Sequence, residues 1–187
     1  MSWQKHVGSV CEKLRLILVK MYSLKPIVSK RILYMLYHSM ADAVLSYGLS
    51  VYGRTSKTNL DKIKLVQTRF LKLLVSRKVK NECNGCYEKL YKICNILPVH
   101  EKFSYLMLVE SFKNPEFKTR CTPSTYNTRS CHVTKYEIPR TVNYFGERTR
   151  RYLLPYLYNK YNLLDDEYPS KNVFKRKIRR LLLDGLP

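Results

Sequence analysis

The chain has 187 residues, and 45% of them are hydrophobic, which allows one ordinary core and excludes a disordered polycation. Lysine and arginine number 35 against 14 aspartates and glutamates, a formal net charge of +21 at pH 7. Such a field attracts phosphate polymers, so nucleic acid is the leading expected partner. No apolar run approaches the roughly 20 residues that span a bilayer, and the first residues lack a signal-peptide pattern. We therefore expect no transmembrane segment and an intracellular, nuclear location.

Helical periodicity begins near the first residue. From Trp3 to Tyr22, apolar residues recur at three- and four-residue spacing on one stripe, which predicts an amphipathic helix. The stripe comprises Val7, Val10, Leu14, Ile17, Leu18 and Met21. We expect the next helix to begin at Lys25-Pro26, because proline is tolerated in a first turn.

The second predicted helix ends at a glycine-containing aromatic turn. Its apolar stripe comprises Val28, Ile32, Leu36, Met40, Ala43, Val44 and Tyr47. Gly48 and Gly53 are expected to break it, and a third helix restarts after Ser56 and Thr58, which we expect to cap it. The third helix repeats the stripe with Leu60, Ile63, Phe70, Leu71 and Leu74. These two helices are therefore predicted to pack together.

Two shorter helices are predicted next. Asn84-Gly85 makes a turn before a short helical pattern that runs from Tyr87 to Cys94. Pro98 begins another helix, which is expected to end near Phe112. Residues 1–112 are therefore predicted to form a helical bundle with short connections.

The rest of the chain divides into an extended arm and a basic helical segment. Residues 113–145 contain prolines and scattered threonine, tyrosine and arginine without a helical period, which indicates an extended linker. Residues 146–187 resume a helical pattern around Pro155, and a final helix is expected from Ser170 to Leu183. The apolar side of that helix comprises Phe174, Ile178, Leu181 and Leu182.

Cysteine usage raises the question of metal binding. The six cysteines are Cys11, Cys83, Cys86, Cys94, Cys121 and Cys131, and we expect reduced thiols in a chain of this size. Cys83, Cys86, Cys94 and His100 have the residue types and rough spacing of a tetrahedral zinc site. The interpretation that we favour is structural, because Cys94 falls on the apolar face of a short helix and His100 lies just inside another. We assign no metal ligand and no cofactor.

Five segments carry a family resemblance by their order and spacing. They are SWQKHV at Ser2 to Val7, LYHSMADAVLSYGLSVYG at Leu36 to Gly53, LVQTRFLKLL at Leu65 to Leu74, ILPVHEKF at Ile96 to Phe103, and the Thr-Arg, Pro-Arg-Thr and Gly-x-Arg series from Tyr126 to Tyr161. Together they resemble the region downstream of the palm in non-LTR, LINE-type, jockey-like retrotransposon reverse transcriptases. The resemblance implies a helical thumb and a C-terminal extension that grip RNA template and nascent DNA.

The sequence departs from that family in having no palm. Polymerisation needs carboxylates that hold two divalent metals about 3.5–4 Å apart, which the family presents from an aromatic-x-Asp-Asp hairpin. The only Asp-Asp pair, Asp165-Asp166, follows Leu163-Leu164 and precedes Pro169 at a spacing that argues against a strand hairpin. We expect this pair to lie in the loop that caps the last helix. No catalytic residue is assigned, and the chain by itself is not expected to be an enzyme.

Basic residues are the candidate contacts to nucleic acid. They are Lys62, Arg69, Lys72, Arg77, Lys78, Lys80, Arg148, Arg150, Arg151, Lys175, Arg176, Arg179 and Arg180. The first three fall within roughly a quarter turn of one helix, which suits a duplex backbone and suits an ordinary solvated face equally well. Arg148, Arg150 and Arg151 lie near Tyr144, Phe145 and Tyr152 in the sequence. Arginine side chains bind phosphate and aromatic rings stack on unpaired bases, so this group is suited to nucleic acid. The basic residues of the final helix, Lys175, Arg176, Arg179 and Arg180, could instead lie on an anionic membrane.

These observations predict a mostly α protein: a thumb-like bundle, an extended arm and basic C-terminal helices. We expect it to bind RNA or an RNA–DNA template–primer through phosphate contacts, as a non-catalytic fragment of a retrotransposon RNA-directed DNA polymerase. Whether a separate chain supplies the palm stays open. So do three alternatives: a zinc-stabilised module that would unfold with chelator, a DNA-binding module, and a decayed copy with no present role.

Overall fold

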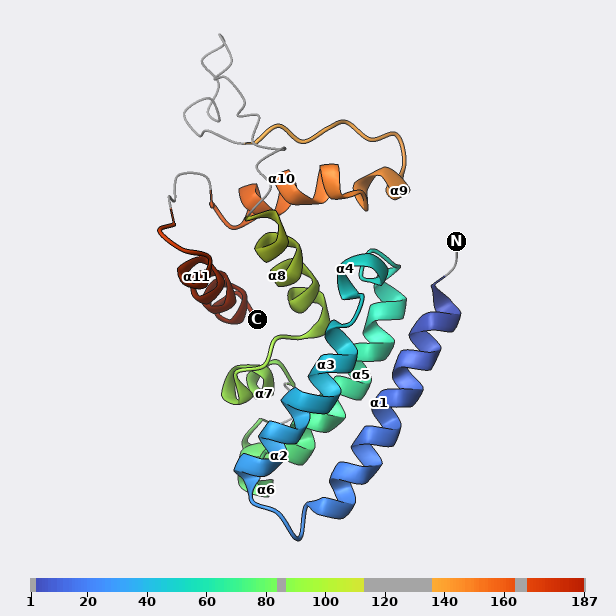
Figure 1. The fold of residues 1–187 in the computed structure, drawn as a ribbon, viewed down its shortest axis with the longest axis vertical. Helices are drawn as coiled ribbons and strands as arrows, with labels where there is room; N and C mark the ends of the chain where they lie inside the picture. Colours follow the sequence, from blue (N-terminus) through green and yellow to red (C-terminus); the bar gives the residue numbers. More distant parts are fainter. Residues whose placement is uncertain (1–2, 84–86, 113–135, 164–167, 187) are drawn as a thin grey trace. The chain divides into compact units, whose positions relative to one another are not determined.

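The computed structural model describes residues 3–83, 87–112, 136–163 and 168–186, and Figure 1 shows that their regular structure is helical. These residues contain no strand, which confirms the predicted mostly α class. Contacts divide the chain into two compact units, Met1–Phe103 with Leu182–Pro187 and Ser104–Leu181. The domain boundaries drawn from the sequence at residues 112 and 145 stay predictions.

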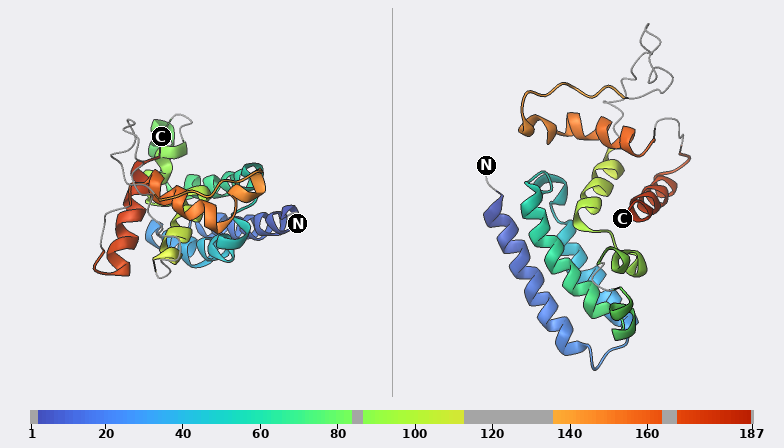
Figure 2. Two further views of the ribbon diagram at one scale, coloured as in Figure 1. Left: turned by 90° about the horizontal axis from the view of Figure 1, so that it is seen from above. Right: turned by 180° about the vertical axis from the view of Figure 1, so that it is seen from behind.

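The first unit is built from helices joined by short connections. They are α1 (Gln4–Leu24), α2 (Lys30–Leu36), the π-helical turn η1 (Tyr37–Ala41), α3 (Asp42–Ser46), α4 (Leu49–Tyr52), α5 (Lys57–Leu74), α6 (Arg77–Glu82), α7 (Tyr87–Cys94) and the beginning of α8 (Val99–Ser111). Figures 1 and 2 show α1, α5 and the run from α2 to α3 side by side. Because α5 contacts α1, α2 and α7, it is the central helix of the unit.

The first predicted helix is confirmed as α1. Every residue of its predicted stripe is buried except Ile17, which is half-buried. At its start, the Trp3 ring meets His6 edge-on, and the His6 ring lies 5.0 Å from the Tyr52 ring of α4. The Trp-x-x-His segment therefore packs against the aromatic turn that follows α3.

The predicted start of the second helix at Lys25-Pro26 is wrong. The backbone N–H groups of Lys25, Ile27 and Val28 bond to the last carbonyls of α1, so this segment forms turns at the end of that helix. Helix α2 begins at Lys30 instead, because the Ser29 side chain caps it by accepting the backbone N–H of Ile32 at 3.5 Å. A proline in a first turn offers no such acceptor.

The predicted buried face of the second helix is also wrong. Its core residues are Leu33, Tyr37, Ala41 and Leu45, whereas Ile32, Met40 and Tyr47 of the predicted stripe are exposed. In an ideal α-helix each four-residue step overshoots a full turn by about 40°, so three steps drift by about 120°. The π-helical turn η1 holds extra residues in one turn and offsets this drift, which keeps a strict four-residue repeat facing the core.

The two glycines of the aromatic turn have different roles. Gly48 has φ +66°, a left-handed conformation that separates α3 from α4, as predicted. Helix α4 ends just before Gly53, where a Cβ atom would collide with the Phe103 ring and the Leu49 carbonyl. Between them, the buried Tyr52 hydroxyl donates to the Leu45 carbonyl at 2.8 Å. The turn is therefore packed into the unit.

Helix α5 confirms the third predicted helix. All five residues of its predicted stripe are buried, and so are Val66, Gln67 and Thr68, because three other helices contact α5. Ser56 occupies the N-cap position, but its hydroxyl bonds to the Thr58 hydroxyl at 2.9 Å and makes no capping bond. The predicted position of the cap is therefore right and the predicted bond is wrong.

The two shorter helices of the first half are confirmed as α7 and α8. Helix α7 ends at Cys94, the next residue, Asn95, has φ +52°, and the Ile96 N–H closes the turn on the Tyr91 carbonyl at 3.0 Å. Helix α8 starts directly after Pro98, as predicted, and ends at Ser111.

The second unit contains the rest of α8 together with α9 (Tyr144–Glu147), α10 (Arg150–Lys160) and most of α11 (Lys171–Asp184). Residues 136–143 of the predicted arm contain no helix, while residues 113–135 and the Asp165-Asp166 pair lie outside the described residues. The side-chain amide of Asn159 bonds both backbone groups of Tyr136, at 2.8 and 2.9 Å, and so attaches the arm to α10. In α11, Leu181 is half-buried and the other predicted apolar residues are buried.

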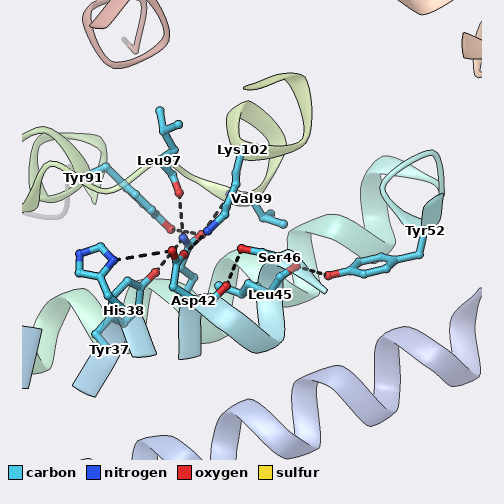
Figure 3. Close-up of polar contacts among 11 residues, drawn as sticks. Tyr37, His38, Asp42, Leu45, Ser46, Tyr52, Tyr91, Leu97, Val99 and Lys102 are labelled. Carbon is cyan, nitrogen blue, oxygen red and sulfur yellow. Dashed lines mark hydrogen bonds and ion pairs between the residues drawn. The ribbon is translucent and has the colours of Figure 1, made fainter. Parts of the chain in front are cut away.

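A buried glutamine joins the elements of the first unit. The Gln67 side chain of α5 is fully buried, and its Nε2 atom donates to the Tyr37 hydroxyl at 3.2 Å and the Leu97 carbonyl at 2.9 Å. Its Oε1 atom accepts the Val99 N–H at 3.0 Å and the Tyr91 hydroxyl at 3.4 Å. Figure 3 labels the four partners, Tyr37, Tyr91, Leu97 and Val99. Because an amide has four hydrogen-bonding positions, Gln67 is fully satisfied.

One ion pair and one histidine–carboxylate hydrogen bond reinforce this arrangement. Lys102 of α8 is buried and pairs with Asp42 of α3, which also lies 3.6 Å from the His38 ring (Figure 3). His100 of α8 pairs with Asp61 of α5 at 2.8 Å. Burial makes breaking the Lys102 pair costly, since it would leave an uncompensated charge. The position of α5 is therefore fixed by hydrogen bonds as well as by packing.

We predict that Gln67→Leu lowers the free energy of unfolding by about 3 kcal/mol, because it leaves several buried polar groups without a partner. The measurement is urea denaturation followed by helical circular dichroism. The matched control is Leu65→Gln, which exchanges the same two residue types at an exposed position of α5 and should change stability by less than about 0.5 kcal/mol. A similar loss in both variants would contradict a specific role for the buried amide.

We also predict alkaline unfolding that is coupled to tyrosine ionisation. Burial raises the pKa of Tyr37 and of Tyr91 above the ordinary value, while hydrogen bonds from Gln67 and Thr68 respectively oppose the rise. Burial likewise raises the pKa of Tyr52. A raised folded-state pKa means that this stability is fully present below about pH 10, the unfolded value, and is lost as pH rises above it.

The measurement compares tyrosinate absorbance with helical circular dichroism across the alkaline range. Some of the 16 tyrosines should ionise only as the helix signal falls, whereas urea-denatured chain should titrate in one step near the ordinary pKa of about 10. Complete ionisation with the helices intact would show that the buried hydroxyls contribute no such coupling.

Candidate nucleic-acid interface

The predicted basic face of α5 is present in the first unit. Lys62 and Arg69 are exposed, seven residues apart on the side of the helix that does not carry Gln67. Lys72 is half-buried, and its Nζ atom lies 4.2 Å from the centre of the Tyr87 ring, a cation–π contact that orients its side chain. Leu65 lies in the same stripe and is 68% exposed. The face is therefore cationic with one exposed apolar side chain.

Helix α1 contributes a further cation, Arg15, which the sequence analysis did not select. Burial raises the pKa of the Cys11 thiol, and the positive charges of Arg15 and Lys62 act in the opposite direction. Both cations therefore lie near the same thiol, although one comes from α1 and the other from α5. No local signal could have grouped them, because the pairing of α1 with α5 is a tertiary contact.

The basic residues that follow α5 in the sequence lie on α6. Arg77, Lys78 and Lys80 are exposed on α6, whose first turn is capped by the Ser76 hydroxyl accepting the Val79 N–H at 3.5 Å. Helix α6 follows α5 after a two-residue connection. Five exposed cations of these two helices, Lys62, Arg69, Arg77, Lys78 and Lys80, are defined here as the α5–α6 basic surface, and Lys57 at the start of α5 is a sixth exposed cation.

The predicted arginines of the second unit divide by their contacts. The Arg148 guanidinium lies over the Tyr144 ring at 3.9 Å from its centre, and its Nε atom is buried without a hydrogen-bond partner among the described residues. Arg150 instead pairs with Glu110 of α8 at 2.9 Å, so its charge is used inside the unit. Arg151 is exposed. Of the three, Arg148 and Arg151 are suited to an external phosphate.

Helix α10 also carries a pair of tyrosines. The rings of Tyr152 and Tyr156 are nearly parallel, with an interplanar angle of 14° and centres 6.2 Å apart. Tyr156 is 42% exposed and was missed by sequence reasoning, although its four-residue spacing from Tyr152 was a usable signal.

The basic residues of α11 are not uniformly accessible. Arg176 and Arg180 are exposed, whereas Lys175 and Arg179 are half-buried. Burial raises the pKa of the Tyr105 hydroxyl, and the charge of Arg179 opposes that rise, so Arg179 lies near a tyrosine of α8. The α11 residues and the arginines of α9 and α10 belong to the second unit, and the α5–α6 basic surface belongs to the first.

The zinc candidates are engaged in other contacts. Cys83 and Cys94 are buried, and burial raises the pKa of the Cys94 thiol while a hydrogen bond with Tyr34 lowers it. His100 is paired with Asp61, and Cys86 lies outside the described residues. Within the described ranges, no three His, Cys, Asp or Glu side chains form a group that could hold a metal ion.

Among the described helices, none combines the length and the hydropathy of a membrane span. Comparison with known proteins found no matching family model, no matching curated protein and no matching solved structure.

Proposed function

We propose that this chain binds RNA or an RNA–DNA duplex without sequence specificity, as a non-catalytic, thumb-like part of a retrotransposon RNA-directed DNA polymerase. The α5–α6 basic surface is the observation that carries the proposal, because its five cations are exposed on helices of a well-packed unit. Phosphate contacts from such residues supply affinity without reading sequence. The catalytic carboxylates and their metals would be supplied by a palm outside this region or on a separate chain, and the complex would act in the nucleus.

The geometry of α5 suits a regular phosphate backbone. Lys62 and Arg69 are separated by about 10.5 Å along the helix axis, since each residue rises by about 1.5 Å. Both side chains are long, and both project from the same side of α5. Two cations of one rigid helix can therefore engage phosphates of one strand together, and the mechanism is one of positioning.

Salt dependence is the first test. If the chain contacts six phosphates of a duplex, its affinity for that duplex should fall by about 1,000-fold between roughly 50 and 200 mM salt. The measurement is fluorescence anisotropy of a labelled RNA–DNA duplex titrated with the chain at several salt concentrations. Affinity that does not change with salt would reject nucleic acid as the partner.

A charge-matched comparison tests the surface itself. The variant Lys62→Gln, Arg69→Gln, Arg77→Gln, Lys78→Gln should lower the slope of log affinity against log salt by about 0.9 per lost contact. The control removes the same total of four positive charges from exposed positions of α1 and α2, through Lys5→Gln, Lys13→Gln, Lys20→Gln and Arg31→Gln. The control should retain most of the slope. Equal losses would show that net charge acts without a defined surface.

A further inference from the structure

The second unit carries exposed aromatic rings at the start of its helical segment. Tyr144 is 57% exposed and Phe145 is 74% exposed, on the four-residue helix α9. The Asn143 side chain caps α9 by accepting the Gly146 N–H at 3.0 Å, which holds this turn in place. Large exposed rings cost solvation free energy, so two adjacent ones on an ordered turn indicate a binding surface.

An arginine is arranged between these rings. The Arg148 guanidinium lies 3.9 Å from the centre of the Tyr144 ring and 5.8 Å from that of Phe145. A guanidinium that stacks on a ring presents its N–H groups in the plane parallel to that ring, which is the arrangement that binds phosphate oxygens. The same few residues therefore offer a flat apolar face and a phosphate donor.

Helix α10 extends this combination. Tyr152, Tyr156 and Lys160 follow at four-residue intervals and share one face, and the two tyrosine rings are nearly parallel. Both Tyr156 and Lys160 are exposed. Residues 136–163 hold five lysines and arginines against two glutamates, so a polyanion is favoured even though Glu147 lies on α9 and Glu110 neutralises Arg150.

We infer that this surface, formed by Tyr144, Phe145, Arg148, Tyr152, Tyr156 and Lys160 and named here the α9–α10 aromatic surface, binds unpaired, single-stranded nucleic acid by base stacking. Aromatic side chains stack on bases only where the bases are not already stacked on each other, and this distinguishes single strands from duplexes. The inference extends the proposed function: the α5–α6 basic surface takes a duplex, and this second surface takes a single strand.

The test compares single-stranded and duplex binding of full-length variants at one salt concentration. The variants are Phe145→Ala and Tyr156→Ala, with labelled oligouridylate and a labelled RNA–DNA duplex as probes. Each variant should bind oligouridylate about tenfold more weakly, because one stacked base is lost, while duplex affinity changes by less than about twofold. Tyr156→Phe keeps the ring and should restore binding of the single strand.

The matched control is Tyr47→Ala, which removes a ring that is 82% exposed on the first unit and should leave oligouridylate affinity unchanged. Circular dichroism checks that each variant keeps its helices.

Three outcomes overturn the inference: equal losses of affinity for both probes, no loss of affinity for oligouridylate, or the same loss in the control. Loss of binding to phosphatidylserine vesicles without loss of oligouridylate binding also overturns it and identifies a lipid surface. If duplex binding is absent while the single-strand effects hold, the duplex-binding role of the α5–α6 basic surface fails and this inference stands.

Discussion

The buried amide of Gln67 is the interaction on which the first unit depends. An amide in the interior stabilises a fold only when all its hydrogen-bonding positions are satisfied, and Gln67 achieves this with groups from η1, α7, α8 and the α7–α8 connection. An apolar side chain at this point would pack against the same neighbours without selecting their register. The four bonds are directional, so they fix the rotation of α5 and with it the direction in which Lys62 and Arg69 project.

Three of the five segments that carry the retrotransposon resemblance meet at this network. Tyr37 comes from the segment Leu36–Gly53, Gln67 from Leu65–Leu74, and Leu97 from Ile96–Phe103. Several polar residues of these segments pair with each other inside the unit, as Gln67 does with Tyr37 and Lys102 with Asp42. In this chain they therefore build the frame, and the α5–α6 basic surface lies on residues mostly outside them. These segments account for how α5 is held in the unit, and the exposed cations account for the α5–α6 basic surface.

Sequence periodicity predicted the elements whose burial follows a simple period. Helices α1, α5 and α11 have one apolar stripe each, so their limits and buried faces could be derived from spacing. The run from α2 to α3 could not, because it is apolar on two sides and a π-helical turn selects the face on which Tyr37 finds Gln67. The candidate site divides in the same way: exposed cations on α5 follow from its stripe, whereas the pairing of Arg150 with Glu110 depends on a contact between distant segments.

The two candidate surfaces differ in the physical basis of their selectivity. The α5–α6 basic surface has exposed cations, which pair with phosphates and carry little information about bases. The α9–α10 aromatic surface has rings with interleaved cations, which need separated bases as well as phosphates. A polymerase template changes between these two forms at the primer end, where single strand becomes duplex. A protein with one surface for each form can hold such a junction without reading its sequence, because structure alone distinguishes the two sides.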